Sequence, residues 1–232
     1  MTPSPVRALV AGATETTHHR VSVMPFIVGA TGRIHYRSWN TDAAHAAVVF
    51  AHGMGQHSGH YHRFAAGLAA AGIALWGIDL AGHGLSEGQP GEPGDVAGHA
   101  ADLAEIAGLA ERSGTPLVVM GHSLGAATVL ALLRSDAGRF RGAVLCGTPR
   151  TATLPATAQV LQAAGLPVLA VHGVDDRLAP VEPVRDWAAT VPELVLREYP
   201  DAGHDLLHEP VQRTVTRDVA DFVLAVTAPG RR

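Results

Sequence analysis

The feature that most constrains the fold is an alternation of two kinds of apolar segment along the chain. Six short runs are rich in β-branched residues, and most of them are nearly continuous in apolar residues, which is typical of strands buried on both faces of a sheet. They lie at residues 47–51, 73–78, 116–120, 142–145, 167–171 and 194–199. Most are separated by segments with helical spacing, so the pattern predicts an α/β domain whose mostly parallel central sheet carries helices on both faces.

The helical segments have apolar stripes and end signals. Phe64 and Leu68 mark one helix, which ends at Gly72. Asp95 is a candidate N-cap for a second helix that extends to Ala107. Further helices are predicted at residues 124–134, 154–164 and 211–226, the last with apolar residues at i, i+4, i+8, i+11, i+12 and i+15.

The N-terminal part of the chain has a different pattern. Residues 20–28 and 33–39 flank the glycine-bounded turn 29–32 and predict an antiparallel hairpin that leads into the parallel sheet. Residues 1–18 are predicted to be a loose tail. Because the rest contains no internal repeat and no linker, residues 19–232 are predicted to form a single domain.

Composition excludes several classes of protein. All 17 basic residues are arginine, so a P-loop phosphate site, a pyridoxal Schiff base and a lysine nucleophile each lack their essential group. A formal net charge of −4 with scattered arginines does not favour nucleic acid as a partner. No apolar run reaches the roughly 18 residues of a membrane helix. The single cysteine, Cys146, cannot form an intrachain disulfide, so we expect a soluble, cytoplasmic protein.

The pattern Gly-x-Ser-x-Gly occurs twice, around Ser86 and around Ser123. A reactive serine in this pattern stands on a tight turn between a strand and a helix, where its hydroxyl is exposed at the carboxyl edge of the sheet. The predicted strand 116–120 and helix 124–134 provide that setting for Ser123. Ser86 is followed by Gln-Pro-Gly-Glu-Pro-Gly at 89–94, which cannot continue as a helix. We therefore take Ser123 as the candidate nucleophile.

A serine nucleophile in this setting needs an acid and then a histidine base later in the chain. His204 lies in the loop between the predicted strand 194–199 and the last helix. Asp175 and Asp176 follow the predicted strand 167–171, and the residues alone leave both open as the acid. Because the carboxyl ends of parallel strands meet at one edge, we expect these groups to lie near Ser123.

An oxyanion hole needs two backbone N–H groups aimed at the developing charge. Leu124, directly after the serine, is one candidate donor. Met54 is the other, because it lies in the glycine-rich loop after the strand 47–51, where Gly53 and Gly55 let the backbone approach a substrate.

The same loop is rich in histidine, with His57, His60 and His62 close together. No carboxylate or cysteine stands nearby in the sequence to complete a set of metal ligands, so we do not predict a metal site here.

Four motifs occur in order along the chain. They are His-Gly-Met-Gly-Gln-His-Ser at 52–58 with Tyr61, Asp-Leu-Ala-Gly-His-Gly-Leu-Ser-Glu-Gly at 79–88, Gly-His-Ser-Leu-Gly at 121–125 and Gly-His-Asp-Leu-Leu-His-Glu at 203–209. With these motifs the chain, from about residue 20 to residue 226, resembles the serine α/β-hydrolases. Within them it is similar to the monoacylglycerol lipase and lysophospholipase-like group, also described as serine aminopeptidase-like.

The resemblance implies roles for individual residues. It implies a catalytic triad of Ser123, Asp176 and His204, oxyanion donors at Met54 and Leu124, and a structural role for Ser86. Substrate-binding residues are expected at Gly53, Gly55, His122 and Leu206. The resemblance implies neither a metal nor an organic cofactor.

The chain departs from the family pattern in two places. Gly125-Ala126 stands where two glycines are usual, and only about twenty residues lie between Leu145 and Pro167, where the family usually inserts a helical cap. The resemblance therefore implies a serine hydrolase with a minimal or absent cap. We expect it to cleave short to medium acyl esters, monoacylglycerol-like ones included. Two alternatives are the cleavage of a thioester, lactone or peptide by the same triad, and a catalytically silent ligand-binding module.

Overall fold

The computed structural model describes residues 26–41, 43–92, 94–152 and 155–230. The predicted tail over residues 1–18 and the first six residues of the predicted hairpin lie outside these ranges.

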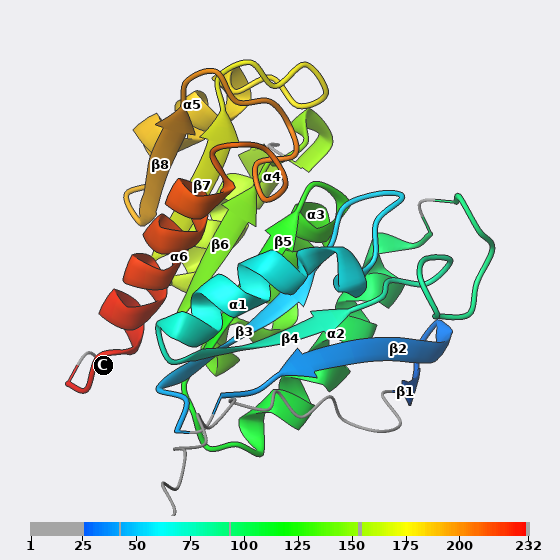
Figure 1. Ribbon diagram of the computed structural model, residues 1–232. Coiled ribbons are helices and arrows are strands. Elements are labelled where there is room, and N and C mark those ends of the chain that lie inside the picture. Colours follow the sequence, from blue (N-terminus) through cyan, green and yellow to red (C-terminus); the bar gives the residue numbers. More distant parts are fainter. Residues whose placement is uncertain (1–25, 42, 93, 153–154, 231–232) are drawn as a thin grey trace, which may run out of the picture.

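The centre of the fold is one eight-stranded sheet with the order β1-β2-β4-β3-β5-β6-β7-β8 (Figure 1). The strands are β1 Phe26–Gly29, β2 Gly32–Trp39, β3 Ala46–Ala51, β4 Ile73–Ile78, β5 Leu117–His122, β6 Gly142–Cys146, β7 Val168–Gly173 and β8 Leu194–Tyr199. Strands β3 to β8 run parallel, whereas β2 pairs antiparallel with both β1 and β4. The predicted fold class and hairpin are confirmed, and the six predicted strands match within two residues at each end, although β8 is largely exposed along its middle.

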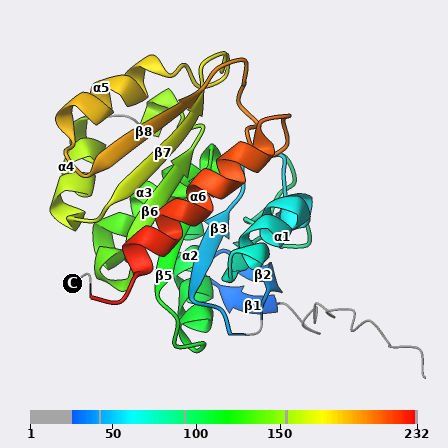
Figure 2. The same ribbon diagram turned by 60° about the vertical axis from the view of Figure 1, so that its left-hand side comes forward.

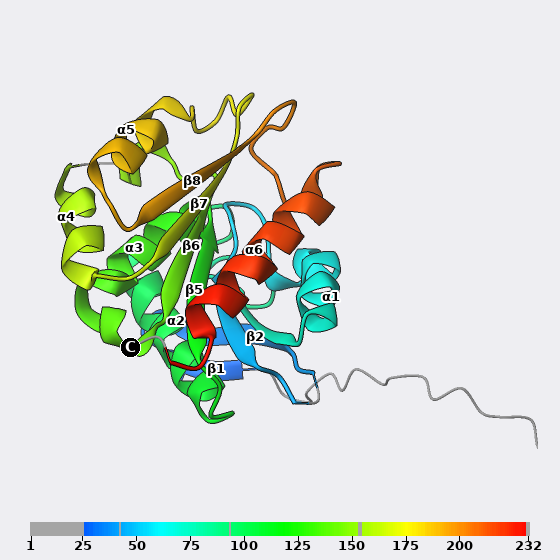
Figure 3. The same cartoon turned by 90° about the vertical axis from the view of Figure 1, so that its left-hand side faces the viewer.

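Helices cover both faces of the sheet (Figures 2 and 3). They are α1 His62–Ala70, α2 Val96–Glu111, α3 Leu124–Asp136, α4 Pro155–Ala164, α5 Glu182–Thr190 and α6 Gln212–Thr227. Successive residues of a strand point to opposite faces. Accordingly, Val48 of β3 packs in a core layer with α1 and α6, and Val49 packs in the layer that includes α2 to α5. The sequence pattern missed α5, because only Val184 and Trp187 of its nine residues are buried.

The connection between β6 and β7 is short. Its described residues form a 3-10 turn at Arg150–Ala152 and helix α4, which packs against α3. Within the described part of this connection, no second domain covers the carboxyl edge of the sheet, in agreement with the predicted loss of the cap.

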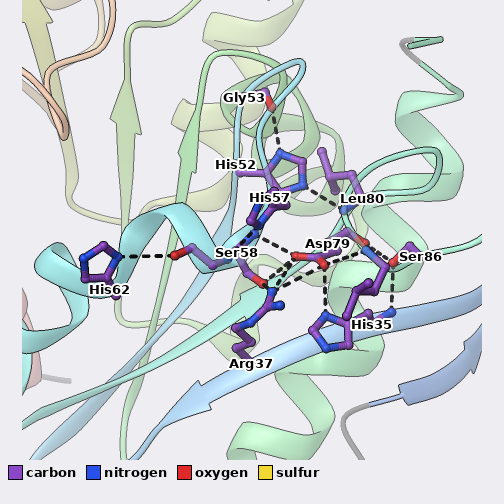
Figure 4. A network of polar contacts seen from close by, with 12 residues as sticks. His35, Arg37, His52, Gly53, His57, Ser58, His62, Asp79, Leu80 and Ser86 are labelled. Atoms are coloured by element: carbon purple, nitrogen blue, oxygen red, sulfur yellow. Dashed lines mark hydrogen bonds and ion pairs between the residues drawn. The ribbon is translucent and has the colours of Figure 1, made fainter. Parts of the chain in front are cut away.

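A buried carboxylate, Asp79, orders the loops at the end of β4 (Figure 4). Its side chain is fully buried and accepts hydrogen bonds from the peptide N–H groups of Ser58 at 2.7 Å and Leu85 at 3.0 Å. From β2, His35 Nδ1 and an Arg37 guanidinium nitrogen approach its oxygens at 2.9 and 3.3 Å. Asp79 therefore joins β2, the loop before α1 and the loop after β4.

Ser86 belongs to this structural network. Its hydroxyl donates to the carbonyl of Asp79 at 2.6 Å and accepts from the peptide N–H of His35 at 2.8 Å. With both hydrogen bonds made to backbone, Ser86 closes the loop after β4.

We predict that Asp79→Asn lowers the free energy of unfolding by about 3 kcal/mol, because an amide of the same shape removes the charge and one acceptor from a buried ion pair. Urea unfolding followed by circular dichroism measures this change. Asp201→Asn is the matched control, because Asp201 is exposed and has a φ of 56°, which asparagine tolerates. An equal loss in the two variants would contradict the role of Asp79.

The same carboxylate predicts acid sensitivity. Burial alone would raise the pKa of Asp79, but hydrogen bonds from Ser58 and Leu85 outweigh burial and lower the pKa below its usual value. A group whose pKa is lower in the folded state stabilises the fold fully above its unfolded pKa, so this contribution is complete above about pH 5 and is lost as the pH falls further. Asp79→Asn should therefore show a weaker loss of stability between pH 5 and 3 than the unsubstituted protein.

Candidate active site

Ser123 stands on a strained turn between β5 and α3. Its φ is 53° and its ψ −112°, a conformation that residues with a side chain rarely adopt. Two close backbone approaches hold this turn. A Cβ on Gly121 would lie 2.1 Å from the carbonyl oxygen of Gly125, and a Cβ on Gly125 would lie 2.0 Å from that of Ala51. The glycines of the motif are therefore required by packing, and Ser123 is presented at the carboxyl edge of the sheet.

His204 and Asp176 meet at the same edge. Asp176 lies in the turn after β7, and His204 lies in the loop after β8. The Nδ1 atom of His204 is 2.7 Å from Oδ2 of Asp176. Asp175, the other residue that the chain leaves open, is exposed. The structure thus brings Asp176 to the histidine, as the family pattern implies.

The Asp176 carboxylate is well supplied with hydrogen-bond donors. Its Oδ1 accepts from the peptide N–H groups of Leu178 at 2.9 Å and Ala179 at 2.8 Å. His172 Nε2 lies 3.4 Å from Oδ2 and donates to the Ala179 carbonyl at 2.6 Å. Burial alone would raise the pKa of Asp176, but the hydrogen bonds from His172, His204 and Ala179 hold it well below its usual range. The carboxyl group is therefore ionised at neutral pH.

Ser123 and His204 line one pocket of about 310 Å³. The other residues that line it are Gly53, Met54, Gln56, His122, Pro149, Leu178, Ala179 and Asp205. A larger groove of about 870 Å³ lies between α2, α3 and the β6–β7 connection, but alanines dominate its lining, which contains no histidine. The chemistry therefore points to the smaller pocket.

Two peptide N–H groups next to this pocket are free to bind a ligand. The N–H of Gly53 is bonded to Gln56 Oε1, and the N–H of Ser123 is bonded to the carbonyl of Cys146. By contrast, the N–H groups of Met54 and Leu124 have no hydrogen-bond partner within the described ranges. Leu124 is the first residue of α3, where N–H groups have no acceptor within the helix.

Gln56 is a site residue that the sequence analysis missed. Its Oε1 accepts from Gly53 N–H at 3.0 Å and from the Tyr61 hydroxyl, and its Nε2 donates to Asp205 Oδ1 at 3.0 Å. It thereby joins the loop after β3 to the loop that carries His204. Only its place in the motif at 52–58 could have pointed to it.

His122 also acts on the loop that carries His204. Its side chain is buried, and burial lowers its pKa to about 4, so the ring is neutral. Because a carbonyl oxygen can only accept, Nε2 of His122 carries the proton and donates to the His204 carbonyl at 2.9 Å. His122 therefore fixes the backbone of the residue that holds the predicted base.

Two of the predicted substrate-binding residues do not line the pocket. Gly55, with a φ of 72°, occupies a turn next to Met54. Leu206 is fully buried and packs in the core layer with Tyr61 and Val215, because the loop after β8 turns this side chain inward. The prediction for Leu206 is corrected accordingly. Gly53 and His122 do line the pocket, and their role in substrate binding stays a prediction.

The described residues contain no group of three or more histidine, cysteine, aspartate or glutamate side chains placed to hold a metal ion. In the same part of the chain, no helix is long and apolar enough to cross a membrane.

The chain is similar to several proteins of known name. A monoacylglycerol lipase of Mycolicibacterium smegmatis is 28% identical over 262 positions, which cover 83% of this chain and 93% of that protein. Human monoglyceride lipase is 30% identical over 53% of this chain and 42% of its own length. The alignment with the bacterial relative is longer than the whole chain of 232 residues, so it includes positions at which the relative has residues that this chain lacks.

Solved structures share the fold. A monoacylglycerol lipase of Paleococcus ferrophilus has a TM-score of 0.67 at 20% identity, covering 83% of this chain and 99% of that one. A carboxyl esterase of Bacillus coagulans has a TM-score of 0.78 at 12% identity, covering 92% of this chain and all of the other.

A family model for serine aminopeptidases of the S33 group matches residues 42–159, just over half of the chain. The match includes the loop with Met54 and the turn with Ser123, while Asp176 and His204 lie beyond it. The chain belongs to the serine aminopeptidase S33 family, with an α/β-hydrolase fold.

Proposed function

We propose that this protein hydrolyses carboxylic esters through an acyl-enzyme, with Ser123 as nucleophile, His204 as general base and Asp176 as the group that orients the base. One observation carries the proposal. Ser123, on its strained turn, shares a pocket with His204, whose Nδ1 is 2.7 Å from the buried carboxylate of Asp176. A nucleophile, a base and an orienting acid from three separate loops is the arrangement that acyl transfer needs.

The first chemical step is the attack of Ser123 on the ester carbonyl. His204 takes the hydroxyl proton at Nε2, and the ionised Asp176 accepts the N–H of Nδ1 and stabilises the imidazolium that forms. The negative charge that develops on the carbonyl oxygen is bound by the N–H groups of Met54 and Leu124. The positive end of the α3 dipole, directly behind Ser123, acts on the same charge.

The next steps complete the acyl-enzyme and then hydrolyse it. His204 gives its proton to the leaving alkoxide, so an alcohol departs and the acyl group stays on Ser123. Water then attacks the acyl-enzyme while His204 takes one of its protons, and the imidazolium returns this proton to the Ser123 oxygen as the carboxylic acid leaves. In this mechanism, every proton moves through one imidazole.

The substrate is proposed to be a short to medium acyl ester, monoacylglycerol-like compounds included. Two relatives named monoacylglycerol lipase and monoglyceride lipase support an ester. The pocket of about 310 Å³ and the short β6–β7 connection support a limited chain length, because little of a long chain would be enclosed. The cytoplasmic location and the single domain over residues 19–232 stay predictions.

We predict that Ser123→Ala lowers kcat on a p-nitrophenyl ester by at least about 10⁴-fold and abolishes labelling by a fluorophosphonate probe, because the nucleophile is lost while binding remains. Ser135→Ala is the control, since Ser135 lies on α3, the helix that follows Ser123, but outside the pocket. An unlabelled, inactive parent protein would instead support a silent binding module. Faster cleavage of a matched thioester, lactone or peptide than of the ester would support another scissile bond.

We predict that Asp176→Asn lowers kcat by about 10⁴-fold, because an amide nitrogen facing His204 favours the wrong tautomer of the imidazole. The asparagine oxygen can still accept from Leu178 and Ala179, so the melting temperature should change much less than the rate. Asp175→Asn provides the comparison at the neighbouring, exposed position and should keep its activity. The reverse pattern would move the acid to Asp175.

A further inference from the structure

Two large apolar side chains at the rim of the catalytic pocket are exposed to solvent. Leu178 is 79% exposed and Met54 is 45% exposed, and both line the pocket that holds Ser123 and His204. They come from different loops, after β7 and after β3. Exposed apolar side chains that gather at one concave site mark a binding surface more often than scattered ones do.

The exposure of Leu178 is imposed by its backbone. Its peptide N–H is bonded to Asp176 Oδ1 at 2.9 Å, and the next N–H, of Ala179, is bonded to the same oxygen at 2.8 Å. The Ala179 carbonyl accepts from buried His172 at 2.6 Å. Three hydrogen bonds therefore hold this loop in the conformation that presents Leu178 to solvent.

Met54 is presented in a similar way. It follows Gly53, whose N–H is bonded to Gln56 Oε1 at 3.0 Å and whose carbonyl accepts from the N–H of Gln56 at 3.2 Å. The turn closed by these two bonds places Met54 at the rim next to its own free N–H. Neither side chain packs in the core, so their apolar surface is available to a ligand.

The pocket between them is too small to enclose a long alkyl chain. Its volume is about 310 Å³, and Ser123, His204 and Gln56 occupy part of its wall. The described residues of the β6–β7 connection place no cap above it. An alkyl chain that leaves this pocket must cross the rim, where Met54 and Leu178 supply apolar surface.

We propose that Met54 and Leu178 form an apolar clamp that binds the alkyl chain of the ester and sets the preferred chain length, in place of a cap. The proposal rests on the proposed function, because it places the chain relative to Ser123. In this proposal the side chains of Met54 and Leu178 determine substrate specificity. The backbone N–H of Met54 has a separate role, which is to bind the oxyanion.

The test compares Leu178→Ala, Met54→Ala and Val195→Ala. Val195 is the matched control, because it is 57% exposed but lies on β8 and does not line the pocket. For each variant, kcat/KM is measured on p-nitrophenyl esters of two to twelve acyl carbons, and on acetate esters of alcohols over the same range. The first series varies the acyl chain and the second the alcohol chain.

We expect the loss in the two clamp variants to grow with chain length, from about 2-fold at two carbons to about 10-fold at eight, because each methylene that contacts the clamp loses apolar burial. Val195→Ala should follow the parent protein at every length. Leu178→Met keeps an apolar side chain of similar volume, so its kcat/KM should vary with chain length much as that of the parent protein does. The series in which the loss grows identifies the half of the ester that the clamp holds.

Length-independent losses in both series, for both clamp variants, would overturn the clamp. Fluorophosphonate labelling separates this result from a failure of the proposed function. If the parent protein and the variants are labelled at Ser123 but their chain-length profiles coincide, the clamp is wrong and the ester hydrolase stands. If the parent protein is neither labelled nor active on any ester, the proposed function fails and the clamp fails with it.

Discussion

The contact on which the rest of the site depends is the approach of α3 to the end of β3. A Cβ on Gly125 would lie 2.0 Å from the carbonyl oxygen of Ala51, so only glycine admits this distance. Because the two backbones touch, the first turn of α3 lies directly behind the loop that carries Met54. The free N–H groups of Met54 and Leu124 can then face the same oxygen atom, although seventy residues separate them. The strained φ of Ser123 is the cost of this arrangement.

Buried and half-buried carboxylates order the loops around this contact. Asp79 binds the N–H groups of Ser58 and Leu85, Asp176 binds those of Leu178 and Ala179, and Glu209 binds those of Gly203 and Asp205. In each case one side chain replaces the hydrogen bonds that a loop cannot make to itself. Pairs of backbone N–H groups supply much of the compensation that these carboxylates need.

The sequence predicts the parts of the structure that follow from local pattern. Runs of apolar residues define the strands, with bounds that match for 73–78 and 194–199, and the strand–turn–helix context distinguishes Ser123 from Ser86. The choice between Asp175 and Asp176 needs the turn geometry, because adjacent residues share the same local signals. Gln56 and Leu178 were missed for a similar reason: their roles depend on contacts between loops. Leu206 was misplaced because an apolar residue beside the base can point either to the pocket or to the core.

The two oxygens of Asp176 link the proposed base to the proposed clamp. One oxygen faces His204, and the other holds the two N–H groups that present Leu178. Removal of the whole carboxylate would therefore disturb the orientation of the proposed base and release the proposed clamp together. A change in chain-length preference after Asp176→Ala would not by itself identify Leu178 as its source. Only a substitution that keeps an acceptor toward Leu178, as asparagine does, separates the two roles. The same geometry explains how an exposed leucine is held in one position although no cap covers it in the described part of the β6–β7 connection, since the carboxylate that holds it is also bonded to His204.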